Sequence, residues 1–363
     1  MAISNQKKEQ IAETVIKILF SRFESFPQDA TANRNAPFHE AFLNAFSDKF
    51  AGKVTDIPFF ISMSSWLHGL NTTMGQTFFE SVAHILSHGE KKEFTSGAGR
   101  AGILPITSQQ KNAASNIITR LSNNETTPNL EIENKLLFVP DTLPLINAID
   151  FSVDVFIETD DEIVAIEMKS VKPNAGEMRG EKQKILEGKA ALFRRYPQKN
   201  IKFYIGFPFD PTNAPEDPTG YNKNRFTASI ININKYFDHN EILLASELWD
   251  YLSDDTNTME QILDIINNIA TPEFMNNYSF LSCNRNRDID PEKYRRLLND
   301  WHLISEINIL DNQQAILEKI GAHRTLQKIY NQSMFCNNKS YNMARARSLM
   351  DLINRDQLAS TVN

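Results

Sequence analysis

The sequence predicts an α/β protein in which a mixed β-sheet is flanked by helices, with helical additions at both ends of the chain. In the first and last thirds of the chain, apolar residues recur with helical spacing. The middle instead holds short segments rich in β-branched and aromatic residues, which are typical of strands. A segment rich in Lys and Glu interrupts these strands at about 177–195. A helix between strands favours a mixed sheet with helices on its faces.

Composition sets wide limits on the class of protein. The chain has 363 residues, of which 41% are hydrophobic and 23% are charged, enough for one large domain or two ordinary ones. The net charge of −7 argues against an indiscriminate nucleic-acid coat but is compatible with a local basic groove. No segment approaches the roughly 18 apolar residues of a membrane span. Since Glu9 and Glu13 also interrupt the N-terminal apolar stretch, we expect a soluble cytoplasmic protein.

The first third is expected to be helical. Apolar spacing predicts helices over 5–24 and 37–51, so residues 1–72 form a helical N-terminal region. A third helix is predicted to begin at Thr73, because residues 73–76 fit a capping box. A fourth is predicted over about 107–122, with a second capping box at its start.

The middle of the chain, residues 73–240, is expected to form the core. The predicted strands cover residues 134–139, 151–158, 162–170, 201–208 and 227–233. From 241 to 363 the pattern is helical again, which predicts a C-terminal region suited to dimerisation or to clamping DNA. The three regions also fit one compact domain.

Two motif matches lack the context that their chemistry requires. Residues 97–102, GAGRAG, match GxGxxG, but a dinucleotide site needs a strand before the glycines and a helix after them. A proline follows closely here, so we expect a loop. His84 and His88 share a helix face, but Ile85 stands where a metalloprotease needs Glu. We therefore expect two exposed histidines.

Three charged residues stand out in the apolar hairpin FSVDVFIETDDEIVAIEMKS, residues 151–170. A two-residue turn at 160–161 would set Asp154 directly opposite Glu167. Opposed residues share a face, with Cβ atoms about 4.5–5.5 Å apart. Lys169 lies on that face too, since strand side chains alternate. A three-residue turn would instead put the two carboxylates on opposite faces.

This arrangement predicts a metal site. Two carboxylates so close together repel each other where solvation is poor, and a divalent cation removes that conflict. Mg²⁺ prefers oxygen ligands and takes one or two carboxylates, several waters and substrate phosphates. A neighbouring lysine can hold or deprotonate the attacking water and stabilise negative charge, as phosphodiester hydrolysis requires. The alternative is an acidic pair bridged by Lys169 at the rim of a sheet, and spacing alone favours neither interpretation.

The hairpin resembles the PD-(D/E)xK nuclease superfamily, in which an Asp begins one central strand and Glu-x-Lys ends the next. Here Val153, not Pro, precedes the Asp, which departs from the literal motif. The superfamily core runs helix, three strands, helix, strand, which is similar to the predicted order. The resemblance implies that Asp154 and Glu167 bind metal, that Lys169 handles the water, and that Glu80 of MGQTFFESVAHIL is an auxiliary metal ligand.

More specifically, the chain resembles the TdeIII family of type II restriction endonucleases. The segments that carry this resemblance are MGQTFFESVAHILSHG, IEMKSVKPNAGEMRGEKQKIL and KFYIGFPFDP. It implies Mg²⁺-dependent cleavage of double-stranded DNA at a short GGNCC-like palindrome, which leaves 5′-phosphate and 3′-hydroxyl ends. It also implies a homodimer and a cognate DNA methyltransferase that protects the host's own sites.

Further residues are weaker candidates. Asp150 has the same parity as Asp154 and competes for its role, and Gln183 on the following helix could reach the site. DNA contacts are expected from basic side chains. The candidates are Lys172, Arg179, Arg285, Arg287 and Arg100. Two alternative functions remain, a nuclease of the same core in DNA repair or RNA processing and a non-enzymatic nucleic-acid-binding protein.

Overall fold

The computed structural model of the chain describes residues 3–27, 37–50, 53, 56–140, 144–169 and 175–360. It divides into two compact units. One unit is Phe79–Glu260, and the other combines Ile3–Phe78 with Gln261–Asn363. The N- and C-terminal helical regions, which the sequence suggests as separate regions, therefore contribute to the same unit.

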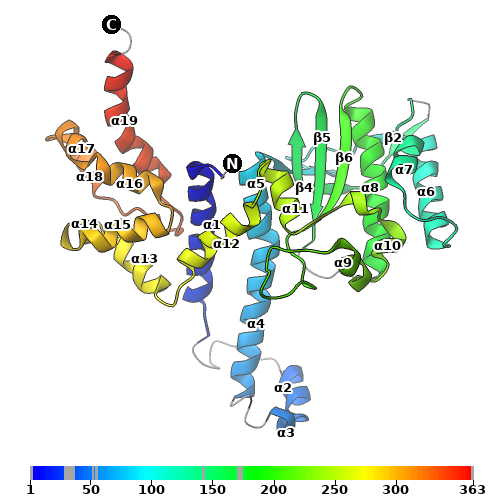
Figure 1. The fold of residues 1–363 in the computed structure, drawn as a ribbon, viewed down its shortest axis with the longest axis horizontal. Helices are drawn as coiled ribbons and strands as arrows, with labels where there is room; N and C mark the ends of the chain where they lie inside the picture. The colour runs from blue at the N-terminus through cyan, green and yellow to red at the C-terminus, as the bar shows by residue number, and fades with distance from the viewer. Residues whose placement is uncertain are drawn as a thin grey trace. The chain divides into compact units, whose positions relative to one another are not determined.

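A five-stranded sheet with the order β1-β4-β5-β6-β7 forms the centre of the first unit (Figure 1). Its strands are β1 (Glu90–Phe94), β4 (Phe151–Glu158), β5 (Glu162–Met168), β6 (Asn200–Phe207) and β7 (Ile242–Leu244). The β1–β4 and β4–β5 pairs are antiparallel, whereas β5–β6 and β6–β7 are parallel. The predicted mixed sheet is thus confirmed. A small second sheet pairs β2 (Pro105–Thr107) with β3 (Leu145–Asn147).

The register of the β4–β5 hairpin is the one that a two-residue turn dictates. The partners are Val155↔Ile166, Phe156↔Ala165, Ile157↔Val164 and Glu158↔Ile163. One step beyond this ladder, the same register sets Asp154 level with Glu167. The register is strongly specified because both faces are buried, so a one-residue slip would move every side chain to the wrong face.

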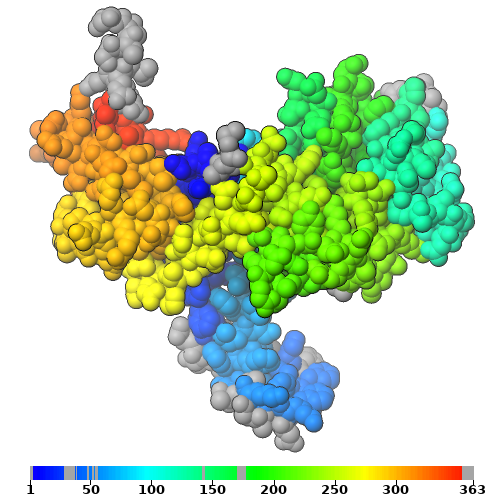
Figure 2. All heavy atoms as spheres, in the orientation of Figure 1, coloured from blue at the N-terminus to red at the C-terminus, as the bar shows by residue number. Residues whose placement is uncertain are grey.

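Helices cover both faces of the sheet in this unit. They are α5 (Glu80–Ser87), α6 (Ser108–Ser122), α7 (Leu130–Leu137), α8 (Ala175–Arg195), α9 (Lys223–Ser229), α10 (Ile233–Tyr236), the 3-10 helix η3 (His239–Glu241) and α11 (Ser246–Ser253). Helix α8 approaches one face so closely that a Cβ on Gly188 would lie 2.9 Å from the Phe203 ring. On the other face, a Cβ on Gly206 would lie 3.2 Å from Leu248 of α11. The α6–α7 segment packs beside the segment that holds α8 and α10 (Figure 2).

The second unit consists of helices. They are α1 (Asn5–Glu24), α2 (Pro37–Asn44), α3 (Ser47–Phe50), α4 (Ile57–Thr73), α13 (Phe274–Ser282), α14 (Asn286–Ile289), α15 (Pro291–Asp300), α16 (Ile304–Asp311), α17 (Gln313–Ile320), α18 (Arg324–Tyr330) and α19 (Met343–Ser360); α12 (Thr258–Ile269) crosses the boundary in sequence. Glu9 of α1 accepts 2.7 Å hydrogen bonds from the amide and hydroxyl of Ser305 in α16. Among the described residues, no helix has the length and apolarity to cross a membrane.

The strands predicted at 134–139 and 227–233 are wrong. Helix α7, residues 130–137, and helix α9, residues 223–229, lie at these places instead. Each helix is capped by an asparagine, since the Asn129 and Asn222 side chains accept hydrogen bonds from the amides of Ile132 and Arg225. Periodicity cannot separate a short apolar strand from a short helix, and these caps favour the helix.

The predicted start of the third helix is also wrong. Thr73 is the last residue of α4, and its hydroxyl donates back to the Gly69 carbonyl rather than capping a new helix. A π-helix, Met74–Phe79, follows it and leads into α5. By contrast, the capping box at Thr107 and Gln110 is present, and α6 begins immediately after Thr107.

Candidate active site

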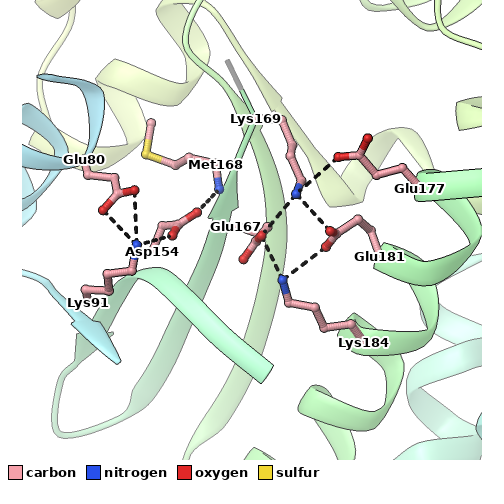
Figure 3. A network of polar contacts seen from close by, with 9 residues as sticks. All are labelled: Glu80, Lys91, Asp154, Glu167, Met168, Lys169, Glu177, Glu181 and Lys184. Carbon is pink, nitrogen blue, oxygen red and sulfur yellow. Dashed lines mark hydrogen bonds and ion pairs between the residues drawn. The ribbon is translucent and has the colours of Figure 1, made fainter. Parts of the chain in front are cut away.

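The three charged residues of the hairpin lie at one end of the β4–β5 pair (Figure 3). Asp154 and Glu167 are only 8% and 6% exposed. The Met168 amide donates a 2.9 Å hydrogen bond to Asp154 Oδ2, which fixes one carboxylate oxygen across the hairpin. The backbone amide of Lys169 donates to the Gly206 carbonyl of β6, so Lys169 is held just beyond the end of β5, beside β6.

Glu167 is a buried carboxylate with one oxygen in use and one free. Oε1 pairs with the ammonium groups of Lys184, at 2.8 Å, and Lys169, at 3.2 Å. Oε2 is buried and has no hydrogen-bond partner. Burial, and then the nearby charge of Asp154, raise the pKa of Glu167. The unpartnered Oε2 can still accept a hydrogen bond or bind a cation.

Lys169 is surrounded by carboxylates. Its Nζ lies 2.9 Å from Glu181, 3.2 Å from Glu167 and 3.7 Å from Glu177 (Figure 3). Burial alone would favour the neutral amine, but the carboxylates outweigh it and raise the pKa of Lys169 above its usual range. The side chain is therefore a charged hydrogen-bond donor in this arrangement, which suits holding a water or a phosphate oxygen better than removing a proton.

Asp154 is held from the other side by β1 and α5. The Lys91 ammonium lies 3.1 Å from Asp154 Oδ1 and 3.1 Å from Glu80 Oε2. One turn along α5, His84 Nε2 is 2.7 Å from the Asp154 carbonyl oxygen. The structure thus brings Glu80 to the acidic pair, as the resemblance implies. The expectation of two exposed histidines is wrong for His84, which is half-buried by this contact, whereas His88 is exposed.

Four residues of this network were not predicted. They are Lys91, Glu177, Glu181 and Lys184. Lys91 lies in a strand that the sequence pattern did not predict. The other three lie on α8, where charges three and four residues apart look like a solvated helix face. The signal that could have found them is the position of α8 directly after the Glu-x-Lys strand.

The weaker candidates lie outside the contacts of this network. Asp150 is exposed and precedes β4, and Gln183 donates to Glu187 instead. Arg179 is exposed on α8, two residues before Glu181. Arg100 pairs with Glu93 at 2.9 Å, in the loop that the GAGRAG segment forms as predicted.

The remaining basic candidates cannot be assigned to the site. Lys172 lies outside the described residues. Arg285 and Arg287 belong to the second unit, where Arg285 is exposed. The Arg287 guanidinium instead lies 4.2 Å from the centre of the Tyr330 ring, and only 11% of its side chain is exposed. The contact with the Tyr330 ring explains why the Arg287 side chain is largely buried.

The donor set suits a hard divalent cation. Among the described residues, no three His, Cys, Asp or Glu side chains already converge on one metal position. Mg²⁺ does not require such a cage, because one or two carboxylates suffice when water and phosphate complete its shell. Asp154 and Glu167 supply two buried carboxylates, and the unpartnered Oε2 of Glu167 is an oxygen that such an ion would satisfy.

A mixed sheet whose central hairpin carries Asp, Glu and Lys on one face is typical of PD-(D/E)xK nucleases. Residues 3–270 match the family model described as "Type II restriction endonuclease, HinfI". The chain is also 41% identical to the type II restriction enzyme MjaII of Methanocaldococcus jannaschii, over 98% of this chain and 99% of that protein. The chain therefore belongs to the HinfI family of type II restriction endonucleases.

The predicted activity is confirmed at this level. The enzyme is a site-specific endodeoxyribonuclease, and its substrate is double-stranded DNA. The segments quoted from the sequence resemble the TdeIII family, whereas the matching model is that of HinfI; both names denote type II restriction endonucleases. The alternatives of a repair or RNA-processing nuclease and of a non-enzymatic binder are thereby set aside.

Proposed function

We propose that the enzyme cleaves DNA in a Mg²⁺-dependent reaction at the Asp154–Glu167 pair, with Lys169 as the third catalytic residue. One observation carries the proposal. Two buried carboxylates face each other at the end of the hairpin, one of them has an unpartnered oxygen, and a charged lysine adjoins it. A buried carboxylate oxygen without a partner calls for an explanation, and a bound ion is one that fits this position.

Asp154 and Glu167 would hold the ion, with Glu80 as an auxiliary ligand. Bound Mg²⁺ supplies a Lewis acid for the phosphate and lowers the pKa of a bound water. The Lys169 ammonium, fixed by Glu181 and Glu167, donates a hydrogen bond to the attacking water or to a phosphate oxygen. Its positive charge stabilises the negative charge that develops on the phosphate oxygens. The products are 5′-phosphate and 3′-hydroxyl ends.

The recognition site is proposed to be a short GGNCC-like palindrome, which rests on the family resemblance. A palindrome is normally read by a two-fold symmetric protein, so we propose a homodimer. Arg179 is a reasonable phosphate contact because it is exposed on α8 close to Glu181. A DNA methyltransferase that modifies the same sequence is the expected counterpart of the enzyme in its host.

Plasmid cleavage with Mg²⁺ or with EDTA tests the proposal. We expect discrete fragments with Mg²⁺, no cleavage with EDTA, and at least about 10³-fold slower cleavage by Lys169→Met and Asp154→Asn. Lys202→Met is the matched control. This lysine also pairs with a carboxylate on the sheet, Glu162 at 2.6 Å, but belongs to no contact of the site.

Each outcome has a separate meaning. Full activity in both site variants would place the active site elsewhere, whereas a smear of fragments would refute sequence specificity. Sequencing of the fragment ends gives the recognition site and the chemistry of the ends. Sedimentation of the protein with and without DNA tests the homodimer, and a monomer on cleavable DNA would contradict it.

A further inference from the structure

The pairing of β1 with β4 is irregular beside the acidic pair, where β4 carries one extra residue. Glu90 pairs with Phe156, but Lys92 pairs with Val153, so two residues of β4 oppose the single residue Lys91. One of these two residues is Asp154. A bulge of this kind bends the strand and changes the direction of a side chain, and bulges are frequent next to active sites.

The bulge brings the Lys91 ammonium between two carboxylates. Nζ lies 3.1 Å from Asp154 Oδ1 and 3.1 and 3.2 Å from the two oxygens of Glu80. The carboxylate side chains are largely buried, with 12% and 17% of their surface exposed, whereas the Lys91 side chain is 43% exposed. Lys91 can therefore turn towards solvent without any change in β1.

We propose that Lys91 is a built-in counter-cation that competes with the metal ion for Asp154 and Glu80. This inference rests on the proposed function, because it concerns the same carboxylates. An ammonium about 3 Å from a carboxylate oxygen places a positive charge close to where Mg²⁺ would bind that oxygen, so the two cations repel each other. Lys91 holds the two carboxylates together, and its charge weakens the affinity of the site for metal.

The neighbouring lysine does not share this position. The Lys92 ammonium lies 4.1 Å from the centre of the Phe156 ring and 3.7 Å from Glu90. Glu167 has other partners than Asp154 and Glu80. Its Oε1 pairs with Lys169 and Lys184, and its Oε2 is unpartnered. Glu167 thus offers a metal ion an oxygen with no competing cation, whereas Asp154 Oδ1 already lies beside the Lys91 ammonium.

Thermal unfolding of the DNA-free protein over a series of Mg²⁺ concentrations measures this competition. A ligand that binds only the folded state raises the melting temperature according to its Kd, so weak sites can be measured without catalysis. We expect Lys91→Met to bind Mg²⁺ about tenfold more tightly than the parent, since two partly buried ion pairs no longer compete with the metal. Lys91→Arg keeps the cation and should stay within about twofold of the parent.

Two further variants separate the possible results. Lys202→Met, which removes a different lysine–carboxylate pair of the same sheet, should leave the Kd unchanged. Asp154→Asn should weaken binding. A purely structural role of Lys91 would lower the metal-free melting temperature of Lys91→Met without tightening its Kd. That result, together with weakened binding by Asp154→Asn, would overturn the counter-cation and leave the proposed function intact. Failure of Mg²⁺ to stabilise both the parent protein and Lys91→Met would refute the metal site itself.

Discussion

Replacement of Lys182 by Met is expected to destabilise the enzyme strongly. Lys182, Lys189, Glu133 and Glu241 form a neutral buried tetrad on the inner side of α8, none of them more than 4% exposed. The Lys182 ammonium lies 2.5 Å from both Glu133 and Glu241, and Lys189 lies 2.7 Å from Glu241. Burial opposes ionisation of Glu241, but Lys189 and Lys182 outweigh it and lower its pKa to about 2. Without Lys182, two buried carboxylates share one cation.

The size of the expected destabilisation follows from the buried carboxylate that Lys182 leaves without a cation. Loss of one partner from a buried ion pair costs about 3–5 kcal/mol, and Lys182 serves two carboxylates, so we expect about 4 kcal/mol. For a unit of this size the melting temperature should fall by about 8–16 °C. Circular dichroism during thermal and urea unfolding measures both quantities. Lys135→Met is the control, because its 2.6 Å pair with Glu131 is 72% and 78% exposed, and such exposed pairs hardly affect stability.

A second substitution tests the reasoning rather than the size of the effect. Lys182→Met combined with Glu133→Gln restores the neutrality of the tetrad, and a glutamine oxygen can still accept from the Asn129 amide as Glu133 does. We expect the double variant to regain about half of the lost free energy of unfolding. If Lys182→Met costs no more than Lys135→Met, or if the double variant is less stable still, the buried charges are not what stabilises this side of α8.

Three further predictions concern pH, the acidic candidates and the lysine environment. Burial, and then the charge of Glu9, raise the pKa of Glu13 from 4.5 to about 7, so its ionisation destabilises the folded state progressively from about pH 4.5 to 7 and fully above pH 7. Glu13→Gln should therefore raise the free energy of unfolding by about 1–2 kcal/mol at pH 8 and hardly at pH 4.5, and an equal gain at both pH values would contradict this. Asp150→Asn should retain cleavage within about twofold, because the residue is exposed and outside the network; a loss as large as that of a metal ligand would make it the catalytic Asp. Glu181→Gln should lower kcat about tenfold with little change in KM, because Lys169 loses a charged partner that fixes its position; an unchanged kcat would count against that role.

The sequence predicted the centre of the fold well because its pattern was clear there. The 151–158 strand and the two-residue turn are present as predicted, and the register follows from the alternation of apolar and charged residues. The strand predicted at 134–139 failed because its apolar run was too short to distinguish it from a helix capped by Asn129. The three-residue strands β2, β3 and β7 offer too little sequence for any period to show.

Residue spacing could predict the candidate site only along the hairpin, and Glu80 came from the family resemblance. Asp154, Glu167 and Lys169 are fixed relative to each other by one local register, so sequence reasoning could place them on one face. Lys91 and Glu181 reach them from other elements, through tertiary contacts that no spacing reveals. The sequence pattern around such residues does not show whether the folded protein buries their charge or leaves it in solvent.

The two sides of α8 predict different kinds of defective enzyme. Glu181 and Lys182 are consecutive, yet the first touches Lys169 at the site and the second lies in the core tetrad. Substitutions at 182 should therefore give a temperature-sensitive enzyme, which cuts DNA in the cold and loses activity as it unfolds on warming. Substitutions at 181 should impair cutting equally at all temperatures. A genetic screen for heat-conditional restriction would thus recover substitutions on the inner side of this helix and miss those on the side that contacts the proposed catalytic lysine.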